Sequence, residues 1–172
     1  MALITSEGRN KMTVKIAIVN SSSFGKNFPD HMKRLEALGE VTRFVLPKDI
    51  RGRELAEKLM GYSIIIASVT GIYDREFFEY KDKTLLIARH GIGYNNIDIE
   101  AATEKNTIVT KVDAIVEREA VAENAIALLM SVIRQIGPAS AKVKESKWAE
   151  RARFVGHEIK GKTAGVIGFG NI

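Results

Sequence analysis

The chain has 172 residues, of which 45% are hydrophobic and 27% are charged, and its formal net charge is +5. This balance is typical of a folded globular protein and excludes an intrinsically disordered chain. The absence of cysteine excludes disulfides, thiolate metal sites and cysteine nucleophiles, and it leads us to expect a cytoplasmic protein.

The first part of the chain alternates short apolar runs with amphipathic ones. Residues 1–12 are polar and resemble no signal peptide, so we expect a loose tail there. Strands are predicted at 13–20, 41–46, 63–69, 84–89 and 107–110, and helices at 29–38, 51–60, 74–78 and 97–105. This alternation predicts an α/β fold, a flavodoxin-like doubly wound parallel sheet over residues 13–111. The longest apolar runs, 63–69 and 125–133, are far shorter than the roughly 20 residues of a membrane span, so we expect no membrane association.

From residue 112 the pattern changes to helices. A long helix is predicted at 119–136, where apolar residues form a wide stripe. Gly137 and Pro138 are expected to end it, a more polar helix is predicted at 139–151, and a strand at 163–168. Glu145 and Glu150 interrupt the basic residues of the second helix, which favours a solvated helix face over nucleic-acid binding.

The chain ends in two glycines spaced as in a dinucleotide-binding fingerprint. Gly168 would allow a tight turn out of the strand, and Gly170 would let the backbone approach a pyrophosphate. Asn171 and Ile172 follow as the next fingerprint positions. Two glycines alone are weak evidence, because a simple strand-ending turn also explains them.

A second glycine pair lies where the fourth predicted strand ends. Gly91 and Gly93 free the backbone to turn its N–H groups toward a small anion such as a carboxylate. Asn95, Asn96 and Asp98 follow, and one of them is expected to cap a helix. The alternative is a glycine loop followed by an N-cap, with no ligand.

Several segments, in order, resemble one enzyme family. They are residues 89–110 (RHGIGYNNIDIEAATEKNTIVT), Ser68-Val69-Thr70, residues 119–124 (EAVAEN), Lys147-Trp148 and Gly161-Lys162-Thr163. Together they are similar to the N-terminal half of a D-isomer-specific 2-hydroxyacid dehydrogenase, ending within its dinucleotide-binding loop. Asn95 and Glu117 depart from the family's usual Asp and Asn.

The resemblance implies an oxidoreductase that uses NAD or NADP to interconvert a 2-hydroxy acid and its 2-oxo acid. Main-chain N–H groups of Ile92 and Gly93 would hold the substrate carboxylate, with Gly91 and Ser68 nearby. Val121, Gly168, Gly170, Asn171 and Ile172 would contact the cofactor. Residues 112–172 would then be the first helices and first strand of a Rossmann NAD(P)-binding lobe.

The resemblance places the catalytic Arg, Glu and His beyond Ile172, so we name no catalytic residue and no metal ligand in this chain. His31, His90 and His157 fall in a helix, at a strand end and in a loop, and only His90 lies near the expected crevice. None is assigned as a general base. We therefore expect the chain to be inactive alone.

Three hypotheses follow. The chain is part of a dehydrogenase whose remainder was lost in cloning or by proteolysis, a ligand-binding or oligomerisation module derived from one, or an unrelated receiver-like domain. A receiver-like domain needs clustered acidic residues at its strand ends for a phospho-acceptor site, and this sequence lacks them. In the first two, the apolar helix at 119–136 is expected to form a homodimer. Neither the particular 2-hydroxy acid nor the choice between NAD and NADP follows from the sequence.

Overall fold

The computed structural model describes residues 14–172. The tail expected at residues 1–12 lies outside the described residues. The chain divides into two compact units, residues 1–112 and 113–172.

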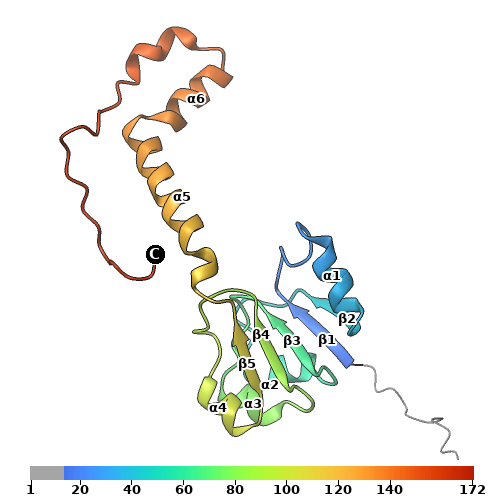
Figure 1. Cartoon of the computed structure of the whole chain (residues 1–172). Helices are drawn as coiled ribbons and strands as arrows, with labels where there is room; N and C mark the ends of the chain where they lie inside the picture. The colour runs from blue at the N-terminus through green and yellow to red at the C-terminus, as the bar shows by residue number, and fades with distance from the viewer. Residues whose placement is uncertain (1–13) are drawn as a thin grey trace, which may run out of the picture. The chain divides into compact units, whose positions relative to one another are not determined.

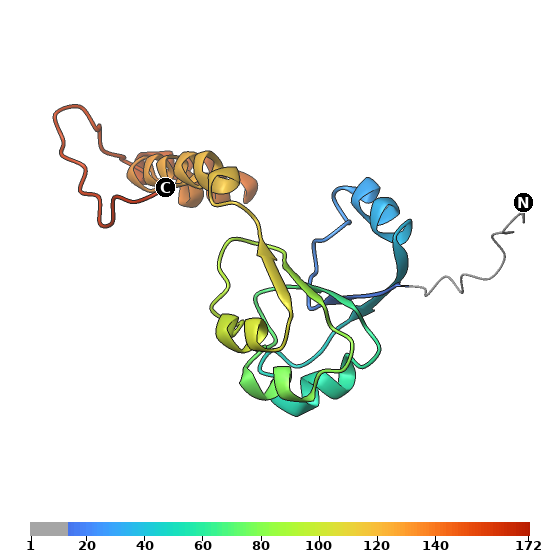
Figure 2. The same cartoon turned by 60° about the horizontal axis from the view of Figure 1, so that its bottom comes forward.

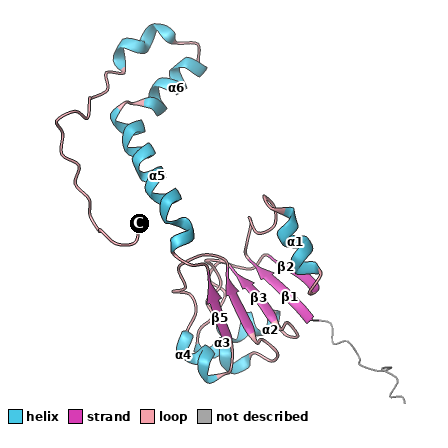
Figure 3. Cartoon of the chain, viewed as in Figure 1, coloured by secondary structure: helices cyan, strands magenta, loops and turns pink. Residues whose placement is uncertain are grey.

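The first unit is built on a parallel sheet of five strands. They are β1 (Val14–Val19), β2 (Gly39–Phe44), β3 (Ile64–Ala67), β4 (Leu86–Arg89) and β5 (Ile108–Lys111), in the order β2-β1-β3-β4-β5 (Figures 1 and 3). All four strand pairs are parallel, which confirms the predicted α/β fold. The strand order reverses at β1, and such a switch point is where open α/β sheets bind ligands.

Alternate residues of the central strands pack on opposite faces of the sheet. In β1, Ile16 and Ile18 belong to one buried cluster, and Ala17 and Val19 belong to another. All four side chains are at most 1% exposed. A strand buried on both faces requires a continuous apolar run, which explains the composition of β1.

Helices cover the two faces unequally. The helix α1 (Pro29–Glu36) lies on one face, and α2 (Gly52–Lys58), α3 (Arg75–Tyr80) and α4 (Ile99–Glu104) lie on the other (Figure 2). The larger core, between these three helices and the sheet, includes Leu55, Phe77 and Ala101. On the α1 side, Ile64, Leu86 and Ile108 form a row across β3, β4 and β5, and Ile108 is 66% exposed.

The second unit begins with α5 (Ile115–Ile133), which starts one turn earlier than predicted. The predicted end of this helix is wrong. The break falls at Gln135, whose φ of 52° is left-handed, and Gly137 and Pro138 lie in the first turn of α6 (Ile136–Lys144). Proline is tolerated there because N–H groups in a first helical turn have no helical acceptor. A short 3-10 helix (Trp148–Arg153) follows.

The strand predicted at 163–168 is also wrong. These residues form no strand, and the side chains of Val166 and Ile167 are exposed. A strand needs a neighbour to pair its backbone groups, and residues 113–172 contain no other strand. Within the described residues, no single helix is long and apolar enough to cross a membrane; α5 and α6 meet that test only as a pair bent by 67°.

Candidate functional site

Three loops follow neighbouring strands at the carboxyl edge of the sheet. One begins at Asn20 after β1, one at Ser68 after β3 and one at His90 after β4. The N–H group of His90 donates to the carbonyl of Ala67 at 2.8 Å, so the loops after β3 and β4 leave the sheet side by side. The structure therefore brings Ser68 and the glycine turn to one place.

The turn after β4 leaves two backbone donors available. Gly91 has a φ of 149°, its N–H group donates to the carbonyl of Arg89, and its carbonyl accepts from Val112. Within the described part of the chain, the N–H groups of Ile92 and Gly93 have no protein acceptor. A Cβ atom at Gly93 would meet nothing within 4 Å. Adjacent free amides in such a turn can bind a small anion.

Arg89, the last residue of β4, supplies a buried cation under this turn. The residue is 6% exposed, and a Cβ atom added to Gly91 would lie 2.5 Å from Nη1 of its guanidinium. Nη1 donates to the carbonyl of His90, but Nε is buried without a hydrogen-bond partner. Arg89 is not among the predicted site residues, although an arginine that ends an otherwise apolar strand is a visible signal in the sequence.

Asn96 ties the loop after β4 to the loop after β3. Its Nδ2 donates to the carbonyl of Ser68 at 3.2 Å and to the carbonyl of Gly71 at 2.9 Å. Asp98 caps α4, because its Oδ1 accepts from the N–H group of Ala101 at 2.9 Å. Of the three candidates for this cap, Asp98 is the residue that forms it, and Asn96 instead fixes the two loops to each other.

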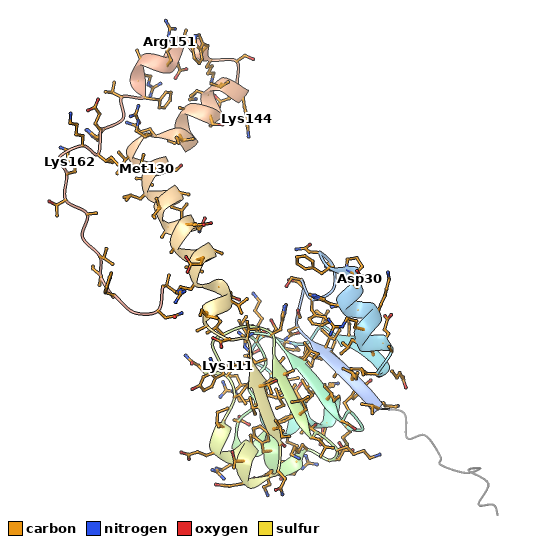
Figure 4. The ribbon with its side chains drawn as sticks, in the orientation of Figure 1. Asp30, Lys111, Met130, Lys144, Arg151 and Lys162 are labelled. Atoms are coloured by element: carbon orange, nitrogen blue, oxygen red, sulfur yellow. The ribbon has the colours of Figure 1, made fainter. Side chains whose placement is uncertain are left out.

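These loops border a hollow of about 480 Å³. It is lined by Lys48, Val69, Thr70, Ile72, Arg89, Gly93, Asn95 and Asn96. A second hollow of about 250 Å³ shares Lys48 and Thr70 and also contains Arg43. Lys111, at the end of β5, lies at the same edge (Figure 4). Its Nζ lies 5.9 Å from the ring centroid of Tyr94. The lining of both hollows includes cations and no carboxylate.

The three histidines lie in different surroundings. His90 Nδ1 lies 3.2 Å from the hydroxyl of Ser21, and its ring meets Phe24 edge to face at 5.3 Å. His31 of α1 lies against Phe28. His157 lies in a loop, where its N–H group donates to the carbonyl of Ile133. Among the described residues, no group of three or more His, Asp or Glu side chains could hold a metal ion.

The residues predicted to contact a cofactor lie in the second unit, in α5 and in the segment after the 3-10 helix. Gly168 has the positive φ, 86°, that the predicted turn needs, and Asn171 Nδ2 donates to the carbonyl of Ala114 at 3.3 Å. Gly170, Ile172 and Val121 are exposed. A hollow in this unit is lined by Met130, Arg134, His157, Glu158, Ile159 and Lys160, none of which was predicted to contact the cofactor. The cofactor contacts therefore stay a prediction.

Several basic residues of the second unit are paired with acidic ones. Lys142 and Lys147 contact Glu145 at 2.8 and 2.9 Å, and Arg153 contacts Glu150 at 2.6 Å. Hydrogen bonds from Lys142 and Lys147 lower the pKa of Glu145. These pairs match the interpretation of a solvated helix surface rather than a continuous basic patch.

Comparison with known proteins identifies the family of the chain. The family model described as "D-isomer specific 2-hydroxyacid dehydrogenase, catalytic domain" matches residues 16–164. The chain belongs to this family. It is 35% identical over 147 residues to a glyoxylate reductase of Thermococcus litoralis, covering 82% of this chain and 44% of that protein. It is 38% identical over 144 residues to a D-3-phosphoglycerate dehydrogenase of Methanocaldococcus jannaschii, covering 83% of this chain and 26% of that protein.

The structural comparison agrees with the family. The D-lactate dehydrogenase of Escherichia coli, solved without ligand, superposes with a TM-score of 0.75 at 28% identity, over 92% of this chain and 49% of that one. The chain therefore spans less than half of the length of each of these relatives. These comparisons confirm the resemblance given in the sequence analysis.

Proposed function

We propose that this chain binds the D-2-hydroxy acid or 2-oxo acid substrate of an NAD- or NADP-dependent oxidoreductase. The observation that carries the proposal is the pair of unpartnered N–H groups at Ile92 and Gly93. They follow Gly91, which packs against the guanidinium of Arg89, and Asn96 of the same loop is bonded to the carbonyl of Ser68. Two amides and a nearby cation are suited to a carboxylate, which all these substrates carry.

We further propose that the chain does not catalyse hydride transfer alone. Oxidation of a 2-hydroxy acid needs a base to accept the hydroxyl proton. The ring of His90 lies at the carboxyl edge, 3.2 Å from the hydroxyl of Ser21 and edge to face with Phe24, and we assign it no role as this base. The terminal residues proposed to contact NAD or NADP, Gly168, Gly170, Asn171 and Ile172, line none of the hollows described above.

An alternative function is supported by α5. None of its residues is buried, and Ile126, Leu128 and Val132 are more than half exposed. An apolar helix with so much exposed surface is typical of an oligomer interface. We therefore include in the proposal a homodimer formed through residues 119–136, which applies whether or not the chain takes part in catalysis.

The test is an amide NMR titration of the chain with pyruvate. We expect shifts at Ser68, Ile92 and Gly93, and no shifts with pyruvamide, which lacks the carboxylate. Gly93→Val fills the open space beside the turn and should weaken binding at least tenfold. Gly165→Val is the matched control, because a Cβ atom there also meets nothing within 4 Å.

Two results would contradict the proposal. Equal shifts with pyruvate and pyruvamide would show that the turn does not recognise a carboxylate. Turnover of glyoxylate, hydroxypyruvate or pyruvate by the purified chain with NADH or NADPH would contradict the expected inactivity.

A further inference from the structure

The free amides of Ile92 and Gly93 lie in a short span of backbone between His90 and Asn96. The side chain of Asn96 fixes one end of this span to the loop after β3. The backbone of His90 fixes the other end, because its N–H group donates to the carbonyl of Ala67 at 2.8 Å. The span that carries the amides is therefore anchored on both sides.

The ring of His90 connects the same end of the span to a third loop, the one after β1. Nδ1 lies 3.2 Å from Oγ of Ser21, and the ring meets Phe24 edge to face with its centroid 5.3 Å away. Oγ of Ser21 also accepts from the N–H group of Phe24 at 3.2 Å. One hydroxyl thus contacts both its own loop and a ring 69 positions further along the chain.

The loop after β1 is held in turn by a side chain from β2. Arg43 donates to the carbonyl of Ser21 at 3.2 Å and to the carbonyl of Phe24. Its Nη2 also lies 3.3 Å from Sδ of Met32, on α1. Because β2 and α1 both contribute to this cluster, the loop offers the ring of His90 a support that is fixed to the rest of the first unit.

We propose that His90 is a positioning residue, which orders the carboxylate-binding amides of Ile92 and Gly93 through its contact with Ser21. This inference rests on the proposed function, because it takes a substrate carboxylate to lie at these amides. Ordering a loop at the moment of binding costs conformational entropy and weakens affinity. A ring that is already held by the loop after β1 restricts the start of the turn before the ligand arrives, so less ordering remains.

The first test measures the pyruvate affinity of two His90 variants by the same amide titration. His90→Leu has no polar atom and should weaken binding about threefold or more, as expected for the loss of one hydrogen bond. His90→Asn keeps a polar atom at the position of Nδ1 and should bind pyruvate within about twofold of the parent. His157→Leu removes a histidine from a loop of the second unit and should leave the affinity unchanged.

The second test approaches the same contact from the loop after β1. Ser21→Ala removes the hydroxyl and should weaken pyruvate binding as His90→Leu does, whereas Ser21→Thr keeps it and should restore the affinity. Ser23→Ala removes a hydroxyl from an exposed residue of the same loop and is the matched control. Since the two damaging variants break one contact, the double variant should lose no more affinity than the weaker-binding single variant.

The outcomes separate this inference from the proposed function. If pyruvate shifts neither Ile92 nor Gly93 in the parent chain, the proposed function is wrong and this inference falls with it. If pyruvate binds the parent but His90→Leu and Ser21→Ala bind it equally well, only the present inference is overturned. Additive losses in the double variant, or a failure of His90→Asn and Ser21→Thr to restore binding, also overturn it. If His90→Leu does not fold, the two Ser21 variants decide.

Discussion

At the scale of single residues, two glycines in one turn have different roles. Gly91 has a φ of 149°, and a Cβ atom there would lie 2.5 Å from a guanidinium nitrogen of Arg89. Gly93 has no such neighbour and lines the hollow. The first glycine therefore shapes the turn over the buried cation, and the second keeps the entrance to its amides open.

Substitution by alanine should separate these roles. Gly91→Ala is expected to lower the free energy of unfolding by about 1–2 kcal/mol, because it forces a strained backbone and displaces Arg89. Gly93→Ala should change it by less than about 0.5 kcal/mol. Urea unfolding of the two variants measures both values, and equal losses would contradict the distinction.

The glycine turn of the candidate site could be predicted from the sequence, but the roles of Asn96 and Arg89 could not. Glycine spacing at positions 91 and 93 is a local signal, so the turn could be read from the sequence. The bridge from Asn96 to Ser68 and Gly71 joins residues 28 and 25 positions apart, and no local pattern reports it. The burial of Arg89 depends on the loops that cover it, and charged residues are ordinarily exposed.

At the scale of elements, α3 and α4 are joined by an ion pair between exposed side chains. Arg75 Nη1 lies 2.5 Å from Oε2 of Glu104, and Nη2 lies 3.2 Å from Oε1. The hydrogen bond from Arg75, and then its charge, lower the pKa of Glu104. A lowered pKa in the folded state means that the pair stabilises the fold above the ordinary glutamate range and loses that effect as pH falls through the lowered value.

Arg75→Gln should raise the pKa of Glu104 toward its ordinary value. Any stability difference between this variant and the parent should be present at neutral pH and should disappear in acid. NMR titration of the Glu104 carboxyl carbon, with urea unfolding at the two pH values, measures both effects. Arg53→Gln removes a pair confined to α2, with Glu57, and should leave Glu104 unchanged.

The strands of the first unit could be predicted because each has its own apolar run and its own neighbours. The same reasoning failed at 163–168, where an apolar run has no strand beside it within residues 113–172. It also failed at the end of α5, because the left-handed backbone at Gln135 cannot be recognised from that residue type. Glycine and proline, at 137 and 138, were the stronger local signals but lie inside the next helix.

At the scale of the whole molecule, α5 determines the expected state of association. Leu129 and Val132 lie one turn apart on this helix and are 48% and 76% exposed. Replacing both with lysine should convert a dimer to a monomer at tens of micromolar, because two charges would have to be buried in the interface. Glu123→Lys changes the net charge by the same amount and should dissociate the dimer less.

Sedimentation of the three proteins provides the measurement. A parent chain that is monomeric at tens of micromolar would contradict the proposed homodimer. Equal dissociation by Glu123→Lys and by the double variant would show that net charge, rather than the apolar surface of α5, controls association.

The amide of Asn96 has a consequence for how the first unit responds to an occupant. Because one side chain holds the backbone on both sides of residues 69 and 70, the segment after β3 and the turn after β4 are energetically coupled. A molecule that draws the turn inward must also move that segment or break the amide contacts. Because of Asn96, the segment after β3 and the turn after β4 would move together around a bound ligand rather than independently.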